Sequence, residues 1–148
     1  MSERDVSERT DRTEYDTNPG ERGKWTSALI ALAGVWMIVE PFVFDVVQSN
    51  LLNDVVVGVV LVALGGFNFY RRADEKVGYA AVAAAAALVG LWLIASPFVY
   101  GRTVPTGVAP ELGFWNDVVV GLLVAASGAY SAYEARETTS DSDRRATA

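Results

Sequence analysis

Four long apolar runs constrain this chain more than any other feature of its sequence. They cover about residues 25–44, 51–70, 77–100 and 114–133, and each contains 20 to 24 residues. A helix of about 20 residues is long enough to cross a hydrocarbon core of about 30 Å. An open strand would leave backbone amides and carbonyls without hydrogen bonds in lipid, so we predict four membrane-spanning helices.

Charged residues are concentrated in the two ends of the chain. Residues 1–24 hold 12 of the 30 charged residues and residues 134–148 hold another 7. A water-soluble bundle is the alternative to a membrane protein, but its helices would each carry a polar stripe, which the apolar runs lack. The segments 1–23 and 134–148 have too little apolar area to offset chain entropy, so we predict that both are disordered.

Lysine and arginine residues indicate how the spans cross the membrane. Eleven of the twelve lie in the two tails or between the second and third spans, and only Arg102 lies in the other two loops. Cytoplasmic segments of membrane proteins are enriched in these residues, so we expect a cell-membrane protein with both termini in the cytoplasm. The first span begins too late for a cleaved secretory signal, and we expect it to remain as an anchor.

The composition excludes several kinds of function. The chain has no Cys and no His, which removes disulfides, thiolate or imidazole metal sites and His-based catalysis. A net charge of −6 argues against nucleic acid as a partner. No nucleophile–base pair, phosphate loop or metal-ligand spacing is recognisable, so we expect no enzymatic activity, catalytic residue, cofactor or bound metal. The partners we expect are the lipid bilayer and either a second copy of the chain or an unidentified membrane protein.

The middle of the chain contains an internal repeat. GVWMIVEPFVF at 34–44 aligns with GLWLIASPFVY at 90–100, and NDVVVG at 53–58 is identical to 116–121. Each copy predicts one helical hairpin. Both hairpins start on the same side of the membrane, so they are parallel repeats related by a pseudo-twofold axis along the membrane normal. We therefore predict an all-α, four-transmembrane-helix bundle built from two parallel helical-hairpin repeats, 24–71 and 72–133, with disordered polar tails.

The repeated motif resembles that of the SPW-repeat membrane proteins, which are named for a Ser-Pro-Trp motif in the first helix of a two-helix repeat. The motif residues here are Trp36, Glu40, Pro41, Phe42, Trp92, Ser96, Pro97 and Phe98. The second copy has Phe98 in place of the family's Trp, and the first copy departs at Glu40 and Phe42. The resemblance implies a small integral membrane protein of no established activity. The acidic composition without Cys is also typical of halophilic archaeal proteins.

The prolines and tryptophans of the motif have simple structural interpretations. Pro41 and Pro97 each remove a backbone hydrogen bond, and we interpret them as fixed kinks in helices that continue beyond them; a hinge or gate is the alternative. Trp36 and Trp92 lie five residues earlier. Their depth favours packing between helices or an interfacial anchor over ligand binding.

Acidic residues near the outer ends of the spans offer the candidate site. We interpret Asn53, Asp54, Asn116 and Asp117 as N-caps of the second and fourth spans, with a cation site formed by the two aspartates as the alternative. A carboxylate inside a membrane span is a functional candidate by default. Glu40, however, lies within about one turn of the outer interface, and the favoured interpretation is that it reaches water there. With these aspartates, Asp45 and Glu111 it would form an acidic outer face.

Pairs of glycines seven residues apart lie on one face of each second helix: Gly58, Gly65, Gly121 and Gly128. Small residues permit close helix contact in lipid, so we predict that the second and fourth spans pack together there.

Three functions are compatible with these features. We first predict a structural or partner-interacting membrane protein without catalytic activity. The alternative is a small ion- or proton-coupled transporter or channel that uses Glu40, Asp54 and Asp117. A receptor or regulatory subunit that acts through the polar tails is the third.

Overall fold

Four helices form the described part of the protein. The structure, a computed structural model, describes residues 19–44, 48–73, 78–100 and 110–146. The helices are α2 (Pro19–Phe44), α3 (Gln48–Ala73), α4 (Ala80–Tyr100) and α5 (Pro110–Ala146), and no strand occurs among these residues. Each helix contains a stretch that is long and apolar enough to cross a membrane: Gly23–Val43, Leu51–Ala73, Ala80–Tyr100 and Leu112–Glu137. The predicted all-α bundle with four membrane spans is confirmed.

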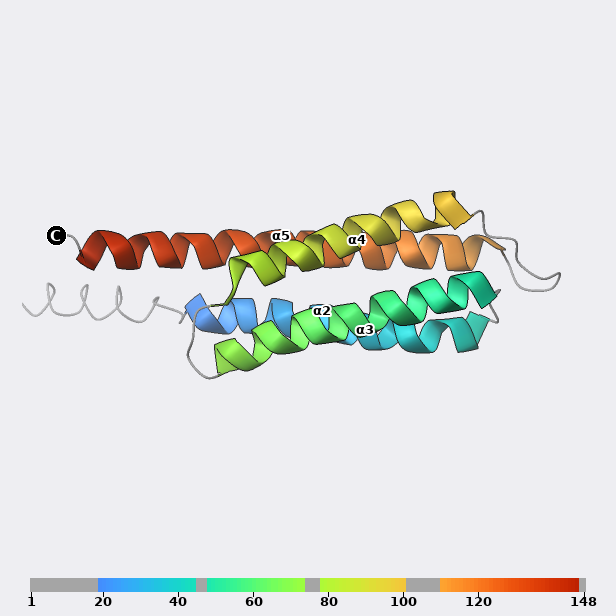
Figure 1. The fold of residues 1–148 in the computed structure, drawn as a ribbon, viewed down its shortest axis with the longest axis horizontal. Coiled ribbons are helices and arrows are strands. Elements are labelled where there is room, and N and C mark those ends of the chain that lie inside the picture. Colours follow the sequence, from blue (N-terminus) through green and yellow to red (C-terminus); the bar gives the residue numbers. More distant parts are fainter. Residues whose placement is uncertain (1–18, 45–47, 74–77, 101–109, 147–148) are drawn as a thin grey trace, which may run out of the picture.

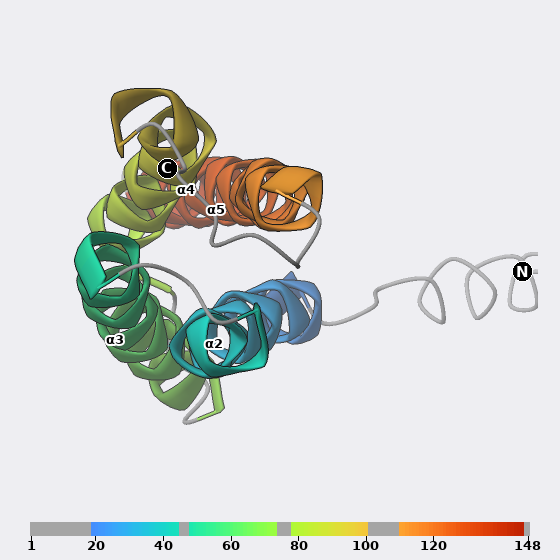
Figure 2. The same cartoon turned by 90° about the vertical axis from the view of Figure 1, so that its right-hand side faces the viewer.

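The helices lie side by side along one axis as two antiparallel hairpins (Figure 1). α2 packs with α3 and α4 packs with α5, while the two hairpins meet through contacts of α2 with α5 and of α3 with α4. The end-on view in Figure 2 shows that the helices follow one another around the bundle in the order α2, α3, α4, α5. α3 and α5 therefore stand diagonally opposite, and the prediction that the second and fourth spans pack together is wrong.

The two helices of each hairpin are in close backbone contact at glycine residues. A Cβ atom placed on Gly58 of α3 would lie 2.7 Å from the carbonyl oxygen of Gly34 in α2, and one on Gly121 of α5 would lie 2.7 Å from that of Gly90 in α4. The first helix of each hairpin thus supplies the matching small residue. That match explains why the predicted glycine faces pack within a hairpin rather than across the pseudo-twofold axis.

The second glycine of each pair makes the same kind of contact about two turns further along. A Cβ atom on Gly65 would lie 2.5 Å from the backbone nitrogen of Ala31, and one on Gly128 would lie 2.6 Å from that of Ala87. The backbones of the two helices in each hairpin therefore approach as closely as helices in lipid do at small residues.

Proline has two different roles in these helices. Pro19 and Pro110 are the first residues of α2 and α5, where a missing amide costs no helical hydrogen bond. Pro41 and Pro97 lie inside helices that run on to Phe44 and Tyr100. The predicted continuation of both spans beyond their prolines is confirmed.

Both polar tails are more helical than predicted. α2 already begins at Pro19, and α5 runs nine residues past the end of its apolar stretch to Ala146, so the prediction of disorder is wrong for 19–23 and 134–146. Extending a helix that the span has already nucleated costs little. The hydroxyls of Thr139 and Ser140 also donate to backbone carbonyls four residues earlier, at 2.9 and 3.0 Å. Residues 1–18 and 147–148 lie outside the described residues.

An apolar layer fills the middle of the bundle. Met37, Leu61, Leu93 and Val124, one from each helix, are fully buried. This apolar layer separates two polar ends of the interior. We call them the carboxylate end, at the close of α2 and α4, and the arginine end, at the close of α3.

Candidate functional site: a buried carboxylate cluster

Three carboxylates from three different helices meet at one end of the bundle. Glu40 comes from α2, Asp54 from α3 and Asp117 from α5. One oxygen of each side chain lies within 4.8 Å of one oxygen of both others. Their exposed fractions are 0%, 1% and 1%. We call these residues the carboxylate cluster; the structure brings together the three residues that the transporter hypothesis names.

The interpretation that Glu40 reaches water at the membrane interface is wrong. Its place on α2 explains the burial: Gly34, Met37, Glu40 and Pro41 are all buried, a spacing of three or four residues that puts them on the helix face toward the bundle. Glu40 therefore continues the core face of α2. Asp45 and the side chain of Glu111, the other members of the predicted acidic face, lie outside what the structure describes.

The N-cap interpretation of the two Asn-Asp pairs is also wrong. α3 begins at Gln48, six residues before Asp54, and α5 begins at Pro110, seven residues before Asp117. Both aspartates are thus inside their helices by more than a turn, where first-turn amides are out of reach. They share the buried face of their helices with the packing glycines Gly58 and Gly121. Their alternative interpretation, a cation site, is compatible with this placement.

Hydrogen bonds across the two hairpins surround the cluster. The indole N–H of Trp36 in α2 donates to Asn116 Oδ1 in α5 at 2.9 Å, and that of Trp92 in α4 donates to Asn53 Oδ1 in α3 at 3.1 Å. Asn53 Nδ2 in turn donates to Asp54 Oδ1 at 3.1 Å. The tryptophans therefore join the hairpins and, through Asn53, orient one carboxylate of the cluster.

A buried arginine, which the sequence analysis did not single out, occupies the opposite end of the bundle. Arg72 at the close of α3 is 8% exposed. Its guanidinium donates to Ser131 Oγ of α5 at 3.0 Å and pairs with Glu134 Oε2 at 3.4 Å. The spacing along α3 does indicate that Arg72 is buried. Arg72 follows Leu61 by eleven residues and Gly65 by seven, so all three lie on the buried face of the helix.

A segment that includes most of both hairpins matches a known protein family. A family model described as the SPW repeat domain matches residues 24–139. The chain belongs to the SPW repeat family. No curated protein and no solved structure matches the chain. The SPW repeat match contains every residue of the carboxylate cluster and all of the four apolar stretches except Gly23, so the cluster is built within the family's own domain.

Within the Ser-Pro-Trp motif, the two hairpins differ at the first residue, which is Glu40 in one copy and Ser96 in the other. Ser96 is buried in α4 at the position equivalent to Glu40, and its hydroxyl donates to the carbonyl of Leu93 at 3.1 Å. The third motif residues, Phe42 and Phe98, are 69% and 70% exposed, as expected for side chains that face lipid. The first copy therefore has a carboxylate where the second copy has a hydroxyl that is hydrogen-bonded within its own helix. Glu40 at this position supplies the third carboxylate of the cluster.

Proposed function

We propose that this SPW repeat protein is a non-enzymatic, multi-pass cell-membrane protein that exchanges a cation for protons at the carboxylate cluster. Such a site would make it a small ion- or proton-coupled transporter or channel. The observation that carries the proposal is the convergence of Glu40, Asp54 and Asp117 within 4.8 Å at exposures of 0–1%.

Charge repulsion explains why such a cluster needs a cation or protons. Two full charges at about this separation repel by about 3 kcal/mol at an effective dielectric constant of about 20. Three such pairs reach about 10 kcal/mol, which is comparable to the whole stability of a typical domain, about 5–15 kcal/mol. Repulsion of this size favours a cation among the three carboxylates. Without the cation, bound protons would neutralise at least part of the cluster.

The oxygen spacing is compatible with one hard cation. Carboxylate oxygens bind Ca²⁺ at about 2.3–2.6 Å, so two oxygens on opposite sides of one such ion lie at most about 5 Å apart. The three cluster oxygens fall within that limit. Because the ligands must be deprotonated to hold the ion, cation binding would release protons.

The position of the cluster suggests how an ion pathway would be closed. Met37, Leu61, Leu93 and Val124 form the apolar layer between the cluster and the arginine end. An ion in the cluster would have to pass this layer to cross the membrane. The two hairpins are the natural moving parts, since close glycine contacts hold each hairpin together internally.

We also propose that both termini lie in the cytoplasm, so that the carboxylate end faces outward. The bias of Lys and Arg toward the tails and the loop between α3 and α4 supports this orientation. The cluster would then load from outside the cell.

Ion flux in proteoliposomes tests the proposed function. The full chain would be reconstituted and exposed to an imposed sodium, calcium or proton gradient beside Glu40→Gln and Asp54→Asn/Asp117→Asn. We expect flux in the wild type and at least a tenfold loss in both variants. Glu137→Gln is the matched control, because it removes an exposed carboxylate at the other end of the bundle. Absence of flux with folded wild type, or flux retained by both cluster variants, would refute the transport proposal.

A structural or partner-interacting role is the second candidate, and the length of α5 favours it. The helix continues from the end of its span at Glu137 to Ala146 and so presents a polar helical surface outside the membrane. A second copy of the chain or another membrane protein could dock there. Sedimentation of the detergent-solubilised protein, full-length and truncated after Glu137, tests self-association: an oligomer that only the full chain forms supports it, and a monomer in both cases argues against a second copy as the partner.

A further inference from the structure

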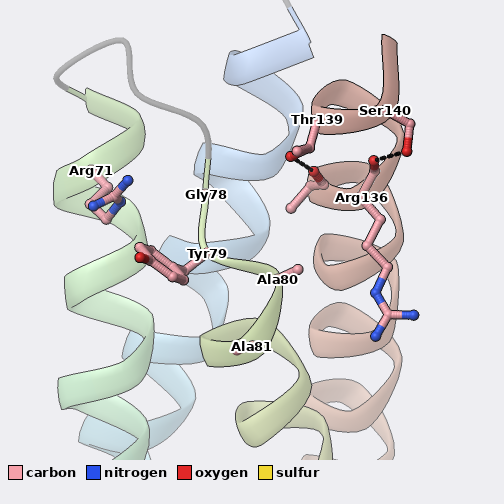
Figure 3. A pocket seen from close by; sticks show the side chains of 9 residues that line it. Arg71, Gly78, Tyr79, Ala80, Ala81, Arg136, Thr139 and Ser140 are labelled. Carbon is pink, nitrogen blue, oxygen red and sulfur yellow. Dashed lines mark hydrogen bonds between the residues drawn. The ribbon is translucent and has the colours of Figure 1, made fainter. Parts of the chain in front are cut away.

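A separate pocket lies at the arginine end, where three spans end (Figure 3). Its volume is about 640 Å³, within the size range of ordinary ligand sites. The start of α4 forms its floor, with α3 on one side and the polar extension of α5 on the other. The charged lining residues are Arg71 and Arg136, and none of the described lining residues is acidic.

Arg71 is held in place but retains hydrogen-bonding capacity. Its guanidinium carbon lies 4.6 Å from the centre of the Tyr79 ring, and Figure 3 shows the two side chains next to each other. Stacking uses the face of the guanidinium and leaves its N–H groups directed outward in the plane. Its Nε is buried and makes no hydrogen bond within the described part of the chain. A buried donor without an acceptor is rare, and a bound anion would supply an acceptor.

The other walls of the pocket add positive charge and donors. Arg136 lines the pocket from α5, and Figure 3 shows its exposed side chain running along that helix with the guanidinium pointing away from Arg71. Ala80 and Ala81 are the first residues of α4, so their amides have no helical acceptor and lie at the positive end of the helix dipole. The hydroxyls of Thr139 and Ser140 already donate to backbone carbonyls, and they can offer only acceptor lone pairs to a ligand. The donors in this pocket thus suit an acceptor-rich anion.

We propose that this pocket binds the phosphate group of an anionic lipid headgroup. Arg71 would hold the phosphate oxygens, while the charge of Arg136 and the first-turn amides of α4 would add to the positive potential. The lipid source follows from position: Arg71, Ala80 and Ala135 lie at the ends of the apolar stretches of α3, α4 and α5, where headgroups meet protein. Basic pockets between spans are a known mode of headgroup recognition. This site does not depend on the carboxylate cluster.

Lipid binding to the full chain in detergent, measured by native mass spectrometry, tests this proposal. Phosphatidylglycerol and phosphatidylcholine with the same acyl chains would be added stepwise. We expect phosphatidylglycerol to bind at least tenfold more tightly to the wild type. Arg71→Gln/Arg136→Gln should lose that preference, whereas Lys24→Gln/Arg144→Gln, with the same change in charge outside the pocket, should keep it.

A pocket-filling variant separates a built site from general charge attraction. Ala81 lines the pocket and is exposed, so Ala81→Leu keeps every charge and the helix while occupying the space. It should also lose the preference for phosphatidylglycerol. The proposal is overturned if the wild type binds both lipids equally, if Ala81→Leu keeps the preference, or if inorganic phosphate displaces the lipid at equal concentration.

Discussion

The indole N–H of Trp36 in the first hairpin lies 2.9 Å from Asn116 Oδ1 in the second hairpin. Trp92 and Asn53 form the reciprocal contact at 3.1 Å. The first helix of each hairpin therefore donates to the second helix of the other one. These two hydrogen bonds connect the repeats directly beside the carboxylate cluster, because Asn53 and Asn116 immediately precede Asp54 and Asp117 in the sequence.

Removing either indole donor should weaken the bundle by a similar amount. We expect Trp36→Phe and Trp92→Phe each to lower the free energy of unfolding by about 1 kcal/mol, the net value of an ordinary hydrogen bond. Denaturation in detergent measures the change. Trp25→Phe is the control because Trp25 is 73% exposed. A cost for Trp25→Phe as large as for the other two would show that ring size, not the cross-hairpin bond, sets the effect.

Two adjacent glycines should respond in opposite ways to alanine. Gly65→Ala should destabilise the protein by about 1–3 kcal/mol, because its Cβ would lie 2.5 Å from the backbone of α2 and would overpack the contact. A Cβ on Gly66 would meet nothing within 4 Å. Gly66→Ala should therefore be neutral or stabilising by up to about 1 kcal/mol through helix propensity. Equal thermal stability of the two variants would contradict the close packing of α2 on α3.

The ion pair at the arginine end should contribute measurably to stability. Arg72→Gln leaves Glu134 without this partner, and we expect a loss of about 2–3 kcal/mol. That figure lies below the value for a fully buried pair because the side chain of Glu134 is 16% exposed. Arg136→Gln, at an exposed position of α5, should change the unfolding free energy by less than about 0.5 kcal/mol in detergent. Similar losses in both variants would argue against the pair.

The orientation of the chain can be read from cysteine labelling. The protein has no native Cys, so each introduced one is a unique target. An impermeant thiol reagent added to intact cells should label Gln48→Cys and Thr106→Cys but not Asp74→Cys. Labelling of Asp74→Cys instead would place both termini outside and would reverse the proposed orientation.

The span count and the hairpin repeat were predictable from the sequence, while the rotation of the helices was not. Length and hydropathy alone define a membrane span. Rotation normally follows from a polar stripe, but lipid-facing positions such as Leu32 and Val59, 65% and 54% exposed, are as apolar as the core residue Met37. The face that carries Glu40 therefore could not be distinguished from the face toward lipid.

Helix boundaries explain the other errors near the carboxylate cluster. The continuous Val-rich run begins at Val55, which made Asn53 and Asp54 look like the start of a helix. α3 instead begins at Gln48. Residues 48–54 are compatible with helix and extend the helix that the apolar span nucleates. The meeting of Asp54 with Asp117, 63 residues later, depends on how the hairpins pack. No local pattern records that packing.

Cation binding with proton release is the measurement that tests the central claim most directly. Calcium or sodium chloride would be titrated into the purified full chain in a weakly buffered detergent solution, while bound cation and pH are both recorded. We predict one bound cation per chain with release of protons for the wild type, and neither for a folded Asp54→Asn/Asp117→Asn variant. A wild type that binds no cation and releases no protons, or a variant that behaves like the wild type, would show that the carboxylate cluster is not an ion site.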